Sequence, residues 1–321
     1  MKIFPLTLIP SDTNFDFMRI RWVTLVLGLL VFATAAGAVA VKGFNFALDF
    51  TGGTALTLRF EQPADVDAVR ARMAEIGHEN AQVQTFGSGT DLLVRMRAEE
   101  GQDTVDDSEQ LARDVQEAVT TPENPAHILD RESIGSQVSA ELAEKATEAV
   151  LFVLVGFLIY IGFRFEWKFA VVASLTTLFD VGVVAGYFAL SGREFDLTVL
   201  AGLLAVMGFS INDTIVVFDR VRENFRAMRA DPHEIFNRSI NQTLSRTIIT
   251  SAVFFLSVLA LYLYGGGSLE GLALTQMIGV VVGTLSSILI ACPLLTVGFL
   301  RVTKQDLLPK AKDEAALARR P

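Results

Sequence analysis

The sequence predicts a polytopic α-helical membrane protein with six transmembrane helices and a ferredoxin-like α+β extracytoplasmic domain between the first and second helices. Of its 321 residues, 51% are hydrophobic, and they gather in runs close to the roughly 20 residues that cross a bilayer. Charge is unevenly divided. Residues 43–148 hold 21 acidic and 8 basic residues, a balance of -13 within a total of -9. The acidity therefore belongs to one soluble domain, and the membrane part is basic.

Six apolar runs are predicted to span the membrane, with ends defined to about 2–4 residues. They cover residues 22–41, 146–163, 169–190, 197–218, 247–264 and 272–300, so residues 146–300 form a five-helix bundle before a cytoplasmic tail, residues 301–321. The last run contains Pro293, which lacks an amide hydrogen and crowds the carbonyl of Leu289. A kink is expected there.

The first run is interpreted as a retained helix. Residues 38–40 fit a signal-peptide cleavage site, but the run exceeds the roughly 7–15 residues of a signal core and follows a long N-terminal segment, residues 1–21. Arg19 and Arg21 place that segment in the cytoplasm, because basic flanks stay on the cytoplasmic side. Residues 43–145 then lie outside.

Residues 43–145 show the order strand, helix, strand, strand, helix, strand. Apolar residues at helical spacing mark the two helices: Val66, Val69, Met73 and Ile76 in the first, and Leu111, Val115 and Val119 in the second. This βαββαβ order is the ferredoxin-like arrangement. His78 and His127 have no ligand pattern around them and are predicted to be surface residues. From Gly135 a polar helical stretch runs into the second span, which would couple this domain mechanically to the membrane.

The remaining connections agree on one orientation. A loop at residues 220–246 contains six arginines, and the tail is also basic, whereas the connection at residues 265–270 has no positive charge. Because basic loops stay in the cytoplasm, both termini and residues 220–246 are predicted to lie inside. No basic patch indicates nucleic-acid binding. The single cysteine, Cys292, is predicted to be a small buried apolar group.

Asn212 and Asp213 stand inside the fourth run, where a charge costs about 3 kcal/mol. Such a carboxyl is either a proton or ion relay or a permanently paired group that fixes helix packing; the relay is preferred. Arg246 is the natural partner, since it opens the fifth run while Asp213 lies only about 9 Å from the same membrane side. The alternative role for Arg246 is an anchor among lipid headgroups.

Asp180, in the third run, is a second intramembrane carboxyl. It either shares a polar seam with Asn212 and Asp213 or is a structural hydrogen-bonding group. Small residues permit close helix approach around the fourth run: Gly202, Ala205 and Gly208. Hydroxyls on the fifth run either line the seam or bond back to their own helix: Thr247, Thr250 and Ser251.

Three motifs resemble the SecF proteins of the SecD/SecF family, a branch of the resistance-nodulation-division superfamily. Asp49-Phe50-Thr51-Gly52-Gly53 follows the first span. The second motif joins residues 210–214 to residues 218–224 at the end of the fourth span, and the third covers residues 239–247. The resemblance covers nearly the whole chain, and the fourth-span motif is highly specific.

The resemblance implies a subunit that pairs with SecD and uses the proton-motive force to assist Sec-dependent protein translocation across the bacterial inner membrane. It also implies association with the SecYEG channel, the accessory protein YajC and the translocating preprotein. By this resemblance, Asp213 would be the proton-coupling carboxyl and Arg246 its basic partner. Asp180 stands where the family tends to have an aspartate in the third span, and Asn212 and Thr247 would be supporting polar residues. No enzyme activity, cofactor or metal is expected, and the coupling ion is H⁺ with Na⁺ as the alternative.

Two other functions are alternatives. Asp180 and Asp213 would suit an intramembrane aspartyl protease, because two carboxyls that share a proton are sound catalytic chemistry. Against this, Asp213 is preceded by Ser-Ile-Asn, not Gly-x-Gly, and Asp180 is predicted about 17 Å from the inner boundary, deeper than Asp213. The second alternative is a half-transporter for a small molecule or lipid, and the small size of the outer domain, about 100 residues, argues against it.

Overall fold

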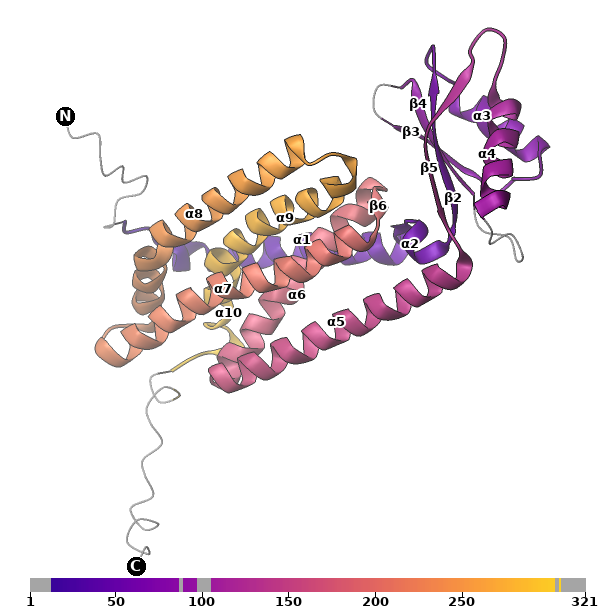
Figure 1. The fold of residues 1–321 in the computed structure, drawn as a ribbon. Helices are drawn as coiled ribbons and strands as arrows, with labels where there is room; N and C mark the ends of the chain where they lie inside the picture. Colours follow the sequence, from indigo (N-terminus) through magenta and orange to yellow (C-terminus); the bar gives the residue numbers. More distant parts are fainter. Residues whose placement is uncertain (1–12, 87–88, 97–104, 304–305, 307–321) are drawn as a thin grey trace, which may run out of the picture. The chain divides into compact units, whose positions relative to one another are not determined.

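The computed structural model describes residues 13–86, 89–96, 105–303 and 306, and the chain forms two compact units (Figure 1). The α+β unit contains residues 45–151 and 194–197. The helical unit contains the preceding N-terminal part, residues 152–193 and the chain from Thr198 onward.

The α+β unit is built on a four-stranded antiparallel sheet with the order β3-β4-β2-β5. Its elements follow the predicted sequence: β2 (Gly53–Phe60), α3 (Val66–Glu75), β3 (Gln82–Phe86), β4 (Asp91–Met96), α4 (Val105–Val119) and β5 (Ala126–Ile134). This strand order is that of the ferredoxin-like fold, which confirms the prediction.

One face of the sheet packs against the two helices. Leu56 and Leu58 of β2 and Val94 of β4 are fully buried, and they share a core with Met73 of α3 and Val115 of α4. The alternation of a strand and the 3.6-residue period of a helix place these side chains together.

Six helices within the described residues are long and apolar enough to cross a membrane. They are α1 (Arg21–Lys42), α5 (Ser136–Arg164), α6 (Trp167–Ser191), α7 (Leu197–Ala227), α8 (Pro232–Tyr264) and α9 (Gly267–Ser286), the last continued by a π-helical turn. A short 3-10 turn, η1 (Phe17–Ile20), precedes α1. The continuous helix expected after Gly135 is confirmed, because α5 is unbroken over 29 residues.

Small residues let these helices approach closely. A Cβ atom on Gly186 of α6 would overlap the backbone of Ala35 in α1. A Cβ atom on Gly202 of α7 would lie 2.8 Å from the Thr275 side chain on α9, as expected for a close contact of the fourth span. Gly208 differs from the prediction, because nothing lies within 4 Å of its would-be Cβ.

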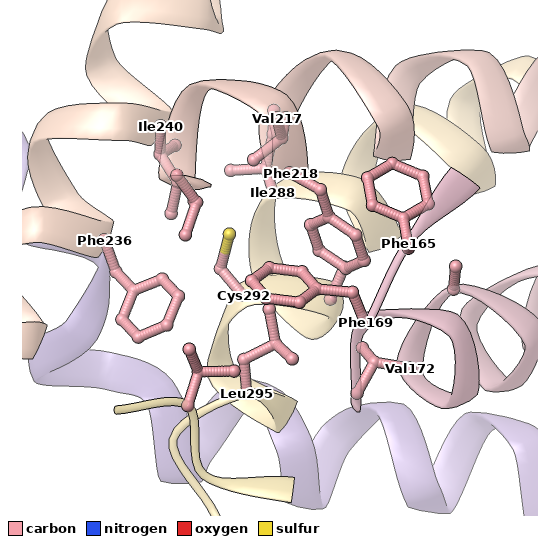
Figure 2. Packing of buried hydrophobic residues seen from close by; sticks show 14 of the residues in the cluster. Phe165, Phe169, Val172, Val217, Phe218, Phe236, Ile240, Ile288, Cys292 and Leu295 are labelled. Atoms are coloured by element: carbon pink, nitrogen blue, oxygen red, sulfur yellow. The ribbon is translucent and has the colours of Figure 1, made fainter. Parts of the chain in front are cut away.

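The last span is irregular before Pro293. The α-helix gives way to a π-helical turn, η2 (Ser287–Ala291), followed by the short α10 (Cys292–Leu294) and η3 (Gly298–Leu300). A proline removes one backbone hydrogen bond, and a wider turn accommodates it. Cys292 is fully buried among apolar side chains, including Phe169, Phe236 and Ile240, as predicted (Figure 2).

The prediction of a loop at residues 220–246 is wrong. Helix α7 continues to Ala227 and α8 begins at Pro232, so most of this segment is helical. Asp231 caps α8, its carboxylate accepting from the His233 amide at 3.0 Å. Phe225 and Phe236 pack with ring centroids 5.4 Å apart, which shows that apolar positions among the arginines hold the two helices together.

Candidate functional site

Five polar side chains on α6, α7, α8 and α9 form a polar seam in the helical unit, four of them buried and Thr284 half-buried. Its members are Asp180, Ser210, Asp213, Ser251 and Thr284. Asp180 is 0% exposed and Asp213 is 3% exposed. Buried polar groups in a bundle of this kind mark a site by default, because hydrocarbon gives them no other partners.

Asp213 contacts the hydroxyl group of Ser251, which contacts a second hydroxyl group. Ser251 of α8 donates to its Oδ2 atom at 3.5 Å, a long contact, and Thr284 of α9 donates to Ser251 at 2.7 Å. The carboxyl therefore connects three helices. A hydroxyl donates to an ionised carboxylate and accepts from a protonated one, so this pair can serve both protonation states.

Asp180 occupies a separate part of the seam. Its Oδ2 atom accepts a hydrogen bond from Ser210 of α7, while its Oδ1 atom has no hydrogen-bond partner among the described residues. Gly283 of α9 lies beside this carboxyl: a Cβ atom there would be in ordinary van der Waals contact with Asp180 Oδ2, at 3.6 Å. Because Asp180 and Asp213 bind different serines, the described hydrogen bonds differ from those of a protease pair that shares one proton.

Four other residues singled out from the sequence form no described hydrogen bond with the seam residues. Arg246 and Asn212 are exposed on the surface of the chain, and no ion pair within the described residues joins Arg246 to Asp213. The charge of Arg246 nevertheless interacts electrostatically with Asp213. Thr247 is 1% exposed, and its Oγ1 atom has no hydrogen-bond partner in the described part of the chain. Thr250 bonds back to its own helix through the Arg246 carbonyl at 3.0 Å.

Sequence reasoning missed the contribution of the sixth span. Thr284 reaches Ser251, and Ser286, beside Gly283, interacts with Asp180. Small and hydroxylated residues recur along this helix at helical spacing: Gly279, Gly283, Ser286 and Ser287. That pattern is the one feature of the sequence that could have indicated a polar face toward α7.

The motif after the first span has a structural arrangement of its own in the α+β unit. Asp49 accepts from the backbone amide of Leu197 at 2.9 Å, and the Thr51 hydroxyl donates to the Ala47 carbonyl. Gly52 has φ +65°, and a Cβ there would lie 3.0 Å from the Ser139 hydroxyl. Gly53, with φ +118°, opens β2. Both glycines adopt backbone angles that L side chains disfavour.

The motif at residues 239–247 holds neighbouring segments. Asn241 forms two hydrogen bonds of 2.9 Å with the backbone of Phe15, and Ser239 accepts from Asn224 at 2.9 Å. Asn237, one turn earlier, accepts from the Met18 amide at 2.9 Å. The start of α8 therefore fixes both the N-terminal segment and the end of α7.

The fold and the seam define a class: multi-pass membrane proteins with buried carboxyls in a helix bundle and an α+β domain inserted after the first helix. Residues 114–299 match the family Protein export membrane protein SecD/SecF, C-terminal, and residues 37–64 match the SecD/SecF GG Motif. The chain belongs to the SecD/SecF family.

Its relatives are protein translocase subunits. The SecF subunit of Pseudomonas aeruginosa is 45% identical over 93% of this chain and 95% of that protein. The SecF subunit of Escherichia coli O157:H7 is 42% identical over 87% of this chain and 86% of that protein. The chain is therefore similar to SecF subunits along almost their full length.

The structural comparison gives the same family. The crystal structure of SecDF from Thermus thermophilus is 39% identical with a TM-score of 0.78, and the match covers 90% of this chain. That match covers 39% of the SecDF chain, so the present chain spans well under half of it. The super-membrane-facing form of SecDF matches with a TM-score of 0.62.

Proposed function

We propose that this chain acts with a SecD partner and uses the proton-motive force to assist Sec-dependent protein translocation across the bacterial inner membrane. Its membership of a family of translocase subunits supports the role in translocation. The observation that supports proton coupling is the buried position of Asp213, on a membrane-spanning helix and next to the hydroxyl of Ser251, which in turn contacts Thr284.

The relatives support a two-chain assembly. Thermus thermophilus SecDF is 41% identical to this chain over 38% of its own length, and its remaining length is what a separate SecD would supply here. The proposed assembly places both termini in the cytoplasm and the α+β unit outside, and includes the SecYEG channel, YajC and the translocating preprotein. Co-purification of the tagged chain from gentle detergent tests this assembly; recovery without a SecD-like chain would contradict it.

Proton coupling requires a carboxyl that takes up and releases a proton as its access alternates. Asp213 would be that group, and the Ser251–Thr284 pair can reverse its hydrogen bonds when the charge changes. Asp180, one helix away and bound to Ser210, would be a second acceptor through its Oδ1 atom. Arg246 would lower the cost of an ionised Asp213 by its charge.

The decisive variant is Asp213→Asn. The amide keeps the shape and hydrogen bonding of the carboxyl but cannot ionise, so export stimulation should fall to the level seen without the subunit. Insertion and pairing should remain, because an amide costs less to bury than a carboxylate. Asp213→Glu should retain part of the activity with a shifted pH dependence. Export of a secreted reporter into inverted membrane vesicles measures both.

Glu223→Gln is the matched control, since it removes an exposed carboxylate near the end of the same helix whose ion pair with Arg220 is a weak surface contact. Collapse of the proton gradient in the wild type should reproduce the Asn phenotype, because each charge that crosses about 100 mV releases roughly 2.3 kcal/mol. Replacing the proton gradient by a sodium gradient distinguishes the two ions. A stable Asp213→Asn chain with full, gradient-sensitive export would contradict the proposal.

A further inference from the structure

A segment of four residues, three of them between α6 and α7 and the fourth the first residue of α7, belongs to the α+β unit. It covers residues 194–197 and contains β6 (Glu194–Phe195), which pairs in parallel with β1 (Asn45–Phe46). The amide of Ala47 donates to the carbonyl of Phe195 at 3.0 Å. The chain therefore returns to the α+β unit immediately before α7, and the helix that carries Asp213 has its first residue there.

Asp49, in the short α2 (Leu48–Thr51), holds that first residue. Its Oδ2 atom accepts from the amide of Leu197 at 2.9 Å, across 148 positions of the sequence. The first four amides of a helix lack partners within the helix, and a carboxylate at this end interacts favourably with the helix dipole. Phe46, Phe50 and Phe195 pack around the same contact with ring centroids 5.4–6.2 Å apart.

Strand β4 supplies the positive charge of this arrangement. Arg95 is 7% exposed, forms an ion pair with Glu194 and interacts with the carboxylates of Glu132 and Asp196. Burial lowers the pKa of Arg95, and these two carboxylates oppose that shift. Because an unpaired buried charge is strongly destabilising, loss of residues 194–196 from the sheet would leave Arg95 with Glu132 of β5 and without Glu194 and Asp196.

We propose that Asp49, Arg95 and Glu194 are positioning residues that tie the first turn of α7 to the sheet, so that movement of the α+β unit and a change of charge at Asp213 act on one helix. Asp213 lies 16 residues after Leu197 in the unbroken α7, a rise of about 24 Å. The inference rests on the proposed role of Asp213 in proton coupling.

The test is hydrogen exchange of the full chain, co-expressed with its SecD partner and placed in lipid nanodiscs. Asp49→Ala should speed exchange of the Leu197 amide roughly fivefold, as expected for the loss of a helix-capping contact. Asp213→Asn should change exchange at residues 45–53 in the wild-type background. Asp213→Asn should not change exchange at residues 45–53 when it is combined with Asp49→Ala or with Arg95→Met/Glu194→Gln. The second of these removes both charges of the ion pair, so that neither is left unpaired.

Two controls distinguish a general loss of stability from the specific loss of the contact between the α+β unit and the first turn of α7. Asp49→Asn retains an oxygen that accepts from Leu197, so it should keep both the protection and the export stimulation that Asp49→Ala loses. Arg59→Met/Asp91→Asn removes the bidentate pair between Arg59 and Asp91, at 2.9 and 2.8 Å, which joins β2 to β4 four positions from Arg95, and it leaves neither charge unpaired. It should behave as wild type.

The inference is overturned if Asp213→Asn does not change amide exchange at residues 45–53 in the wild-type background. It is also overturned if Asp213→Asn still changes that exchange in Asp49→Ala or in Arg95→Met/Glu194→Gln. Full export stimulation by Asp49→Ala overturns it as well. Full gradient-driven export by Asp213→Asn would contradict the proposed function instead. The role of Asp49 as a positioning residue would then be tested by two comparisons of Asp49→Ala with Asp49→Asn: the exchange rate of the Leu197 amide, and export stimulation.

Discussion

Arg246 should act through its charge. The side chain is exposed, forms no described ion pair with Asp213 and yet interacts with it electrostatically. Arg246→Lys should therefore retain part of the export stimulation, and Arg246→Met should retain little, as measured with a secreted reporter. Arg238→Met is the matched control, because Arg238 is also exposed and lies eight residues earlier on α8. Full activity of Arg246→Met would leave the headgroup anchor as its role.

Glu132 gives the α+β unit a dependence on pH. Partial loss of hydration and the carboxylates of Asp49, Asp130 and Asp196 raise its pKa above the ordinary 4.5, while Arg95 opposes them. A carboxyl whose pKa is raised by folding stabilises the fold in its protonated form. That contribution is present at low pH and is lost as the pH rises through the pKa of the folded state.

Glu132→Gln should accordingly stabilise β5 above that pKa and have no effect below it. The measurement is the ratio of amide exchange rates on β5 between variant and wild type in the full chain at each pH, since the intrinsic pH dependence of exchange cancels in the ratio. A ratio that does not vary with pH would show that Glu132 does not titrate in this range. Glu123, an exposed acidic residue just before β5, offers Glu123→Gln as the control.

The sequence indicated which residues are unusual better than it indicated which way their side chains point. An intramembrane carboxyl is conspicuous because its burial is costly, so Asp180 and Asp213 stand out from the residue pattern alone. Whether Asn212 or Arg246 points inward depends on the rotation of a helix about its axis, which neighbouring helices decide. Both point outward in this chain. Thr284 was missed because a threonine in an apolar run is ordinary.

At the scale of helices, close packing should make Gly186 intolerant of any side chain. A Cβ there would overlap both the Cβ and the backbone of Ala35 on α1, and backbone atoms cannot move aside as a flexible side chain can. Gly186→Ala should therefore lower the free energy of unfolding by about 1–3 kcal/mol, the usual cost of overpacking. The measurement is thermal unfolding in detergent.

Gly208→Ala provides the comparison, because it makes the same chemical change on a neighbouring helix where nothing lies within 4 Å of the added atom. It should be neutral or slightly stabilising, since alanine is the better helix former. Equal unfolding temperatures for the two variants would show that α1 and α6 can separate enough to admit a methyl group.

The elements that were mispredicted share a physical cause. Residues 220–246 were expected to be a loop because their arginines mark the cytoplasmic side, but the positive-inside rule concerns sidedness and leaves secondary structure open. Apolar residues such as Phe225 and Phe236 continue the helical period through the charges. Strands β1 and β6 were missed because each has two residues and their pairing joins segments about 150 positions apart. The ferredoxin-like sheet was predicted correctly because its period and turns are local.

At the scale of the whole molecule, the α+β unit is expected to be a moving part. Its core is filled by apolar residues from the sheet and its two helices. The chain links this unit to the membrane helices through the continuous α5 and through the start of α7. Movement of the unit is therefore expected to reach the membrane helices through these connections.

A reversible cross-link between this unit and the outer domain of the SecD partner tests that expectation. Cysteine at the exposed Glu79, screened against single cysteines in the partner, gives a specific disulfide, because the native Cys292 is fully buried and unreactive toward it. The oxidised pair should lose export stimulation while co-purification of the two chains stays intact, and reduction of the same sample should restore activity. Unchanged export in the fully oxidised form would show that the proton-coupled step proceeds without movement of the α+β unit.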